Sequence, residues 1–373
     1  MAGIYIHIPF CKQACHYCDF HFSTNTSYLE QMIQMIGKEA ALRKEYLKGH
    51  TIETIYFGGG TPSILEPKWI DFLLENLKRI FQLNLKEITL EANPDDLTTE
   101  KLQAWKSVGI DRLSLGIQSF DDEILRLYNR AHNSKESIEA IAKARKIGFE
   151  KFSMDLIYGF PSQDHQLWEK DLSTALEQDP GHLSCYALSV EPRTALGKWE
   201  KTGKFEPASE DFVAEQFEIL QAFTETKGYR QYEISNFASS GNEAIHNSNY
   251  WKGLSYLGLG PGAHSFDGEK RGANVRNNIQ FIRAIEANQI PFEIEEMDEL
   301  DRLNEYILTS LRTSWGLDIS FVSQTFEKDL IQEKRSEISK FQEQGWLVWK
   351  DNTLSLSKSG MLLADSIAAA LFF

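Results

Sequence analysis

The sequence predicts an α/β fold, in which an incomplete (β/α)6 barrel of the TIM type is followed by a small helical, winged-helix-like domain. Short apolar runs alternate with stretches of helical periodicity, which is the pattern of βα units that build a parallel sheet. Near residue 298 this alternation gives way to helical stripes and one hairpin, which predicts the second domain. The strands are expected at residues 4–8, 54–57, 87–90, 112–117, 152–158 and 183–190.

Two of the helices between these strands carry start and stop signals. The first is expected over residues 99–108, with Gly109 as its C-cap. The second begins after Asn133 or Ser134 as N-cap and ends before Gly148. Apolar residues at helical spacing are expected to face the sheet: Leu102, Trp105 and Val108 in the first helix, and Ile138, Ile141, Ala142 and Ile147 in the second.

The last 75 or so residues read as a separate small unit, because a chain of 373 residues exceeds the usual ~100–200 residues per domain. A helical stripe is expected to end near Gly316, and a hairpin is expected to turn at residues 350–352. We therefore divide the chain into a barrel at 1–235, a connecting region at 236–297 and a winged-helix-like domain at 298–373. The stripe consists of Leu300, Leu303, Ile307, Leu308 and Leu311.

Charge and composition exclude several classes of protein. The 54 acidic residues against 39 basic ones give a net charge of −15, which argues against extensive electrostatic binding to nucleic-acid phosphates. The first ten residues have no basic lead and are interrupted by His7 and Pro9, so they do not resemble a signal peptide. No stretch approaches the ~20 apolar residues of a membrane span. We expect a cytoplasmic protein.

Polar residues follow each predicted strand, where barrels of this kind carry their chemistry. Because the carboxyl ends of parallel strands meet at one mouth, we expect these residues to form one site. They are the cysteines after the first strand, Gly58-Gly59-Gly60-Thr61-Pro62, Glu91-Ala92-Asn93-Pro94, Gln118, Asp155 with Tyr158-Gly159-Phe160-Pro161, and Tyr186.

Three of the four cysteines are crowded into a C-x3-C-x2-C segment, Cys11, Cys15 and Cys18. This crowding predicts a metal in a reducing compartment, and thiolates suit either zinc or an iron–sulfur cluster. A cluster held by three cysteines leaves one iron open to an outside ligand, whereas structural zinc would recruit His7, His16 or His21. Cys185 lies in an apolar strand and is expected to be a buried small hydrophobe.

The cysteine segment, with Tyr17 before the last cysteine, resembles the signature of the radical S-adenosylmethionine (SAM) superfamily. The resemblance extends in order over nearly the whole chain to the family of oxygen-independent coproporphyrinogen III oxidase and its heme-chaperone relatives. The matching segments are residues 5–11, 58–62, 116–118, 129–130, 155–159 and 258–265.

This resemblance implies a radical SAM barrel with a [4Fe–4S] cluster on the three cysteines and SAM on the open iron. Glu91 and Asp155 can accept hydrogen bonds from ribose hydroxyls or an ammonium group, and Arg130 can pair with a carboxylate. Taken singly, such residues often only cap helices, but their convergence favours a ligand site. The implied SAM site consists of Tyr5, Tyr17, Gly59, Gly60, Thr61, Glu91, Gln118, Arg130 and Asp155.

Two features favour the heme-chaperone branch over the oxidase. The oxidase pattern continues with a further cysteine, at the position where this chain has Phe20, and its N-terminal lead is longer. An H-N-x-x-Y-W segment resembles the chaperone branch, because imidazole ligates heme iron and aromatic faces pack on porphyrin. The implied heme residues are His246, Asn247, Tyr250 and Trp251, although His264 is a further possible iron ligand.

The first functional hypothesis is therefore a heme chaperone that binds a [4Fe–4S] cluster, SAM and heme and delivers heme to acceptor proteins. Membrane respiratory enzymes are candidate acceptors, a peripheral membrane location is compatible with that role, and a homodimer is a candidate state. The alternative is an oxygen-independent coproporphyrinogen III oxidase, which decarboxylates its substrate in porphyrin metabolism by radical chemistry. The departures from the oxidase pattern lead us to expect no such activity.

Overall fold

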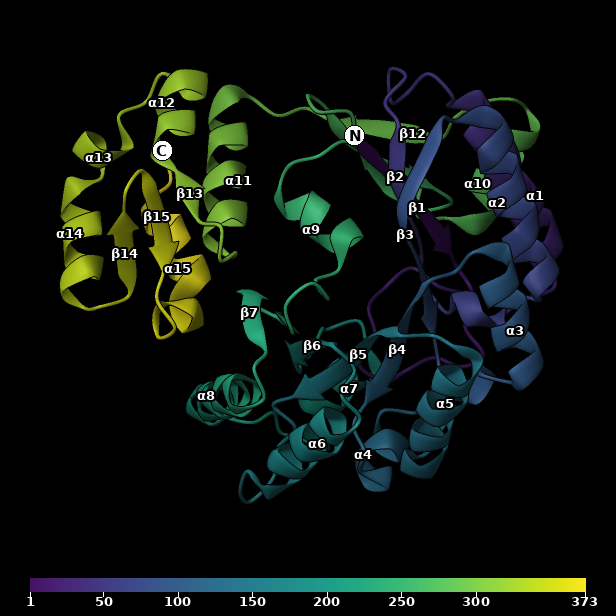
Figure 1. The fold of residues 1–373 in the computed structure, drawn as a ribbon, viewed down its shortest axis with the longest axis horizontal. Coiled ribbons are helices and arrows are strands. Elements are labelled where there is room, and N and C mark those ends of the chain that lie inside the picture. The colour runs from purple at the N-terminus through teal and green to yellow at the C-terminus, as the bar shows by residue number, and fades with distance from the viewer.

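The computed structural model describes residues 1–373 and places the six predicted strands side by side in one sheet (Figure 1). Each strand pairs in parallel with the next, which confirms the α/β fold built from βα units. The last strand ends at Ala187 rather than at residue 190. The strands are β1 (Ala2–Ile8), β2 (Ile52–Gly59), β3 (Leu83–Ala92), β4 (Arg112–Gln118), β5 (Lys151–Tyr158) and β6 (His182–Ala187).

Further strands extend this sheet at both edges, and it has twelve strands in all. β9 (Tyr256–Leu259) pairs in parallel with β1, so the first strand of the chain lies inside the sheet. Beyond β9 lie the antiparallel strands β10 (His264–Phe266), β11 (Arg271–Asn274) and β12 (Phe292–Glu295). At the other edge β8 (Asn236–Ala238) and β7 (Arg230–Glu233) follow β6.

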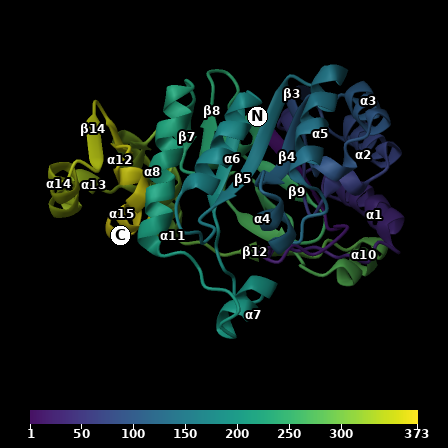
Figure 2. The ribbon, with the colours of Figure 1, turned by 90° about the horizontal axis from the view of Figure 1, so that it is seen from below.

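Most helices follow the strands and cover the outer face of the sheet, but the helix at Ile245–Trp251 lies on the inner face, where His246 stacks on Tyr56 (Figures 1 and 2). Figure 2 also shows α7 standing away from the rest of the fold. The helices of this part are α1 (Leu29–Leu42), α2 (Pro67–Ile80), α3 (Thr99–Val108), α4 (Asp122–Leu127), α5 (Ser134–Ile147), α6 (Gln166–Glu177), α7 (Ala195–Lys201), α8 (Glu210–Thr226), α9 (Ile245–Trp251) and α10 (Asn278–Glu286).

The predicted ends of α3 and α5 are confirmed. Gly109 and Gly148 take left-handed conformations after the last turns, and Asn133 forms a capping box with Glu136 at the start of α5. The predicted buried face of α5 is wrong, because Ile138 is 40% exposed and Ala142 is also exposed. Small side chains face inward instead and let the helix approach its neighbours closely: Ser137, Ala140 and Ala144, together with Ile141.

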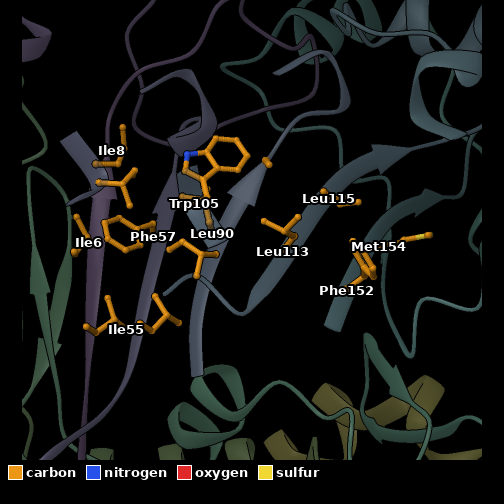
Figure 3. Close-up of a cluster of buried hydrophobic side chains, with 14 of the residues drawn as sticks. Ile6, Ile8, Ile55, Phe57, Leu90, Trp105, Leu113, Leu115, Phe152 and Met154 are labelled. Atoms are coloured by element: carbon orange, nitrogen blue, oxygen red, sulfur yellow. The ribbon is translucent and has the colours of Figure 1, made fainter. Parts of the chain in front are cut away.

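Alternation along the strands separates a core face from a polar inner face. In β1, Ile4, Ile6 and Ile8 are fully buried toward the helices, whereas Tyr5 and His7 point to the opposite side. The core side chains of β1 to β5 belong to one hydrophobic cluster, and Figure 3 shows the part of it around Trp105 of α3. The inner face therefore receives the intervening residues, which in β2 to β5 include Tyr56, Glu91, Ser114 and Asp155.

Residues from Leu303 to Leu371 form a second, separate hydrophobic cluster, which we call the C-terminal unit. Its hairpin is antiparallel as predicted, and Leu303, Ile307 and Leu311 are buried, but Leu300 is exposed. None of the helices in the structure has both the length and the apolar composition needed to cross a membrane. The elements are α11 (Glu299–Leu311), β13 (Leu317–Asp318), α12 (Ile319–Phe326), α13 (Leu330–Glu333), α14 (Arg335–Glu343), β14 (Leu347–Lys350), β15 (Thr353–Leu356) and α15 (Ala364–Ala370).

Candidate functional site

A cavity of about 720 Å³ lies at the carboxyl ends of the parallel strands. It brings together the three clustered cysteines and all the residues expected at the SAM site except Tyr5. Tyr5 lies beside it, stacked on Tyr56 with the ring centroids 6.0 Å apart, and lines an adjoining cavity. The expected residues that line the 720 Å³ cavity are Cys11, Cys15, Cys18, Tyr17, Gly59, Gly60, Thr61, Glu91, Gln118, Arg130 and Asp155.

The cysteine loop follows β1 and is fixed by hydrogen bonds to the segment after α4. The Gln13 side chain donates to the Asn129 carbonyl at 2.8 Å, and the Asn129 side chain donates to the Ala14 carbonyl at 2.8 Å. The His16 amide donates to the Tyr128 carbonyl. Because these contacts join residues more than 100 positions apart, the loop conformation depends on the folded barrel.

Two donors point at cysteine sulfur atoms. Thr61 Oγ1 lies 3.4 Å from Cys11 Sγ, and an Arg130 nitrogen lies 3.3 Å from Cys15 Sγ. Burial raises the pKa of the Cys11 thiol to about 11, so metal binding at neutral pH has to displace its proton. Cys185 does not line the cavity and is buried in β6.

The arrangement of the thiols suits a cluster better than a single ion. No group of three His, Cys, Asp or Glu side chains in the structure is arranged to hold one metal ion. A cubane cluster spreads its cysteine ligands over different iron atoms and does not need that convergence. Of the histidines considered for zinc, His7 has both ring nitrogens hydrogen-bonded, to Tyr5 Oη and the His21 carbonyl, whereas His16 and His21 each have one ring nitrogen bonded.

Arg130 connects the cysteine loop to the strand ends. One terminal nitrogen donates to Asn93 Oδ1 at 2.6 Å and to the Gly116 carbonyl at 2.8 Å, and the other contacts Cys15 Sγ and Tyr17 Oη. Its Nε is buried and has no hydrogen-bond partner in the structure. A buried donor without a partner beside the cavity fits an anionic ligand group such as a carboxylate.

Two carboxyl groups, those of Glu91 and Asp155, also line the cavity. Glu91 accepts hydrogen bonds from Tyr56 Oη at 2.8 Å and from the Gly59 amide at 3.2 Å, and Asp155 accepts from Ser114 Oγ at 3.2 Å. Burial raises the pKa of Glu91 to about 8 and that of Asp155 to about 6. A ligand that brings a cation or hydroxyl donors would favour their ionised forms.

The raised pKa of Glu91 predicts a pH-dependent stability. The folded state holds the proton more tightly than the unfolded state, so the free energy of unfolding falls as the pH rises from the ordinary pKa of 4.5 to about 8. Glu91→Gln is expected to flatten this fall by about 1 kcal/mol per pH unit, below the full ~1.4 because the cavity admits water. Urea unfolding of cluster-free protein across this range measures it.

The control for this prediction is Glu45→Gln, which removes an exposed carboxylate outside the cavity. It should leave the slope of stability against pH as in the wild type. Equal slopes in Glu91→Gln and wild type would show that Glu91 is ionised as easily in the folded chain as in the unfolded one.

Two residues at this cavity have strained backbones. Gln118 has φ +70° directly after the irregular register at the end of β4, and Asn129 has φ +57° before Arg130. Such conformations cost free energy and persist where the surrounding structure imposes them, often at functional sites. In both cases the turn brings a polar side chain to the lining of the cavity.

Helix α9 carries the four residues expected to bind heme and directs them to different places. His246 is 1% exposed, and its ring nitrogens are 2.8 Å from Thr54 Oγ1 and 2.8 Å from Tyr250 Oη. Neither ring nitrogen is free to bind iron in this arrangement. Asn247 lines the 720 Å³ cavity, whereas Tyr250 and Trp251 line the adjoining one.

The adjoining cavity is larger, about 1110 Å³, and lies between the barrel and the C-terminal unit. Its walls come from α9, from the β9 to β11 edge of the sheet, and from α11 and α12 (Figure 1). The two cavities share Phe20, Gly59, Glu91 and Arg276 in their linings. Phe20 is 73% exposed, so an apolar ring stands at the boundary between them.

Several lining residues were not expected from the sequence. Tyr56 and Ser114 could have been found, because each lies two positions before a glycine of the motifs and therefore on the same strand face. Asn93 belongs to a strand-end segment that the sequence did indicate. No sequence pattern indicated Arg276 or the residues of α11 and α12. They reach the cavities only because the later part of the chain folds back beside β1.

A loop of three cysteines after the first strand, a glycine motif after the second and a polar inner face define a radical SAM protein. Residues 5–175 match the family model described as Radical SAM superfamily, and residues 297–363 match the HemN C-terminal domain. The chain belongs to the radical SAM superfamily and, within it, to the family of the heme chaperone HemW. The superfamily implies a [4Fe–4S] cluster and SAM.

Relatives cover almost the whole chain. The protein named heme chaperone HemW of Bacillus subtilis (strain 168) is 33% identical over 99% of both chains. A mitochondrial protein of Bos taurus, radical S-adenosyl methionine domain-containing protein 1, is 32% identical over 99% of this chain and 87% of its own. The solved structure of coproporphyrinogen III oxidase (HemN) from Escherichia coli is similar in fold, with a TM-score of 0.86, 23% identity, and coverage of 100% of this chain and 90% of its own.

Proposed function

We propose that this protein is a heme chaperone of the radical SAM type. It would bind a [4Fe–4S] cluster, SAM and heme, and deliver heme to acceptor proteins. The observation that carries the proposal is the pair of adjoining cavities, one lined by the three cysteines and one lined largely by aromatic and basic side chains. Full-length similarity to proteins named heme chaperone HemW supports it.

In the smaller cavity, Cys11, Cys15 and Cys18 would hold the cluster, whose open iron supplies the binding point for SAM. Arg130 would use its free Nε to bind the SAM carboxylate. Glu91 and Asp155 would accept hydrogen bonds from the ribose hydroxyls, and this contact would favour their ionised forms. The strained turns at Gln118 and Asn129 fix the polar lining before the ligand arrives.

Phe20 favours the chaperone over the oxidase. It occupies the position of the extra cysteine in the oxidase pattern, so no sulfur ligand stands there. Its exposed ring instead gives the boundary between the cavities an apolar surface. An apolar boundary suits a protein that holds a preformed porphyrin beside the cluster.

The test uses anaerobically purified protein with its cluster. Added hemin should give a saturable Soret band, and a heme-free b-type cytochrome should then acquire heme from the loaded protein. The same protein, given coproporphyrinogen III, SAM and a reductant, should form no decarboxylated product. Conversion of the porphyrinogen over many turnovers would contradict the proposal, as would the absence of saturable hemin binding.

A further inference from the structure

We infer that heme lies in the larger cavity, with the imidazole of His264 as its iron ligand and the guanidinium groups of Arg276 and Arg302 facing its carboxylates. This inference rests on the proposed function, because it gives the heme that the function requires a place and a set of contacts. Imidazole is a common axial ligand of heme iron, and arginine forms charge-assisted hydrogen bonds with carboxylates.

Aromatic side chains from both units line the larger cavity. Tyr250 and Trp251 come from α9, and Tyr306, Phe321 and Phe326 come from α11 and α12 (Figure 1). The ring centroids of Tyr306 and Phe321 are 4.5 Å apart, yet Phe321 is 42% exposed. Rings that line a cavity on both sides, of which Phe321 is exposed and the other four are half-buried, match a flat, conjugated, largely apolar ligand.

The size of the larger cavity also suits such a ligand. Its volume of about 1110 Å³ is slightly above the range of about 300–1,000 Å³ for cofactor and small-molecule sites, so it has room for a large planar ligand. Phe20 and Gly59 belong to the linings of both cavities, so a ligand in the larger one lies next to the cysteine loop. This placement puts the heme beside the cysteine loop and against the wall that the larger cavity shares with the SAM site at Gly59 and Glu91.

Among the histidines that line this cavity, His264 is the one whose ring makes no hydrogen bond. The ring of His7 is bonded to Tyr5 Oη and to the His21 carbonyl, and the ring of His21 is bonded to Asn278. His264 begins β10 and its side chain is exposed to the cavity. His246, which the motif suggested, is buried behind Tyr250 with both ring nitrogens bonded.

Of the three arginines that line the larger cavity, one is paired with carboxylates and two are not. Arg271 is paired with Glu295 and Glu305. The other acidic groups are engaged as well: Asp318 caps α12, Glu269 pairs with Lys48, and Glu91 accepts from Tyr56.

Arg276 and Arg302 make no ion pair or side-chain hydrogen bond in the structure, although both line the larger cavity and are exposed. One arginine comes from the barrel and the other from the C-terminal unit. A dicarboxylate ligand could therefore be held from both sides of the cavity.

The test is a hemin titration of full-length protein, followed by difference absorbance against the same sample without hemin. His264→Ala should weaken hemin binding at least tenfold and move the Soret maximum. Free imidazole should restore the wild-type spectrum, because it supplies the missing iron ligand. The His264 side chain makes no hydrogen bond, so thermal melting should show a folded variant.

Metal-free protoporphyrin IX, followed by its fluorescence, separates the iron ligand from the other contacts. His264→Ala should bind it as the wild type does, whereas the double variant Arg276→Ala/Arg302→Ala should lose affinity for both ligands. His246→Ala tests the competing ligand that the motif suggests; it should keep the wild-type Soret maximum, because both ring nitrogens of His246 are already hydrogen-bonded. The matched control is His50→Ala, which removes an exposed imidazole outside both cavities.

An unchanged hemin spectrum and affinity in His264→Ala would overturn the inference while leaving the proposed function intact. A Soret shift confined to His246→Ala would also overturn it. If the wild type does not bind hemin saturably, it is the proposed function that fails.

Discussion

Replacing Cys15 by alanine is expected to abolish the brown absorbance of the cluster while the chain stays folded. The loop has three cysteines and no spare one, so the loss of one thiolate leaves two of the four irons without a protein ligand. The fold should persist, because the main hydrophobic cluster does not include Cys15. Iron and sulfide analysis, visible absorbance and far-UV circular dichroism together measure the outcome.

Cys185→Ala is the matched control, since it makes the same chemical change at a buried site in β6 away from the cavity. It should keep a full cluster and lower the free energy of unfolding by about 1 kcal/mol, the usual size of a small core truncation. A full cluster in Cys15→Ala would mean that other residues hold the iron.

Gly60→Ala is expected to disrupt the cluster site by displacing the backbone directly before Cys11. A Cβ at Gly60 would lie 2.6 Å from the Phe10 carbonyl oxygen and 2.9 Å from the Phe10 nitrogen. These are backbone atoms directly before Cys11, and the Thr61 amide donates to the same carbonyl at 2.7 Å. Neither side can yield without moving the cysteine loop, so we expect less than about a fifth of the wild-type iron and a loss of about 2–3 kcal/mol in stability.

Gly37→Ala provides the comparison, because the nearest atoms there belong to the ends of the Asn76 and Phe72 side chains, which can move. Inside α1 the exchange should be neutral or stabilising by up to about 1 kcal/mol, since alanine favours helix over glycine. Iron content after identical reconstitution and denaturant midpoints distinguish the two variants. Wild-type iron content in Gly60→Ala would show that the loop adjusts without losing its ligand geometry.

The parallel core of the fold could be predicted because each strand is an apolar run with clear breaks on either side. The ends of α3 and α5 followed from Gly109, Asn133 and Gly148, whose backbone preferences act locally. The buried face of α5 could not be predicted, because small residues there pack more closely than Ile138 would. The edge strands β7 to β12 were also beyond prediction, since they are short and depend on neighbours far away in the sequence.

The smaller cavity could be anticipated because strand ends of a parallel sheet must meet, whatever lies between them. The larger cavity could not, because it needs the C-terminal unit to lie against the barrel edge. For the same reason, the sequence could not show that His246 is enclosed while His264 is open to a cavity. Motif spacing identifies residue types, but only packing decides which nitrogen atoms remain available.

The pairing of β1 with β9 affects how the protein is made. β1 is synthesised first, yet its partner Tyr256–Leu259 leaves the ribosome about 250 residues later, roughly 10–50 s at ordinary translation rates. Until then one edge of the strand that precedes the cysteines has no neighbour and can pair with other chains. Nascent or truncated chains that stop short of Leu259 would therefore be prone to aggregate. A cluster inserted during translation would bind to a cysteine loop whose preceding strand is paired on one edge only.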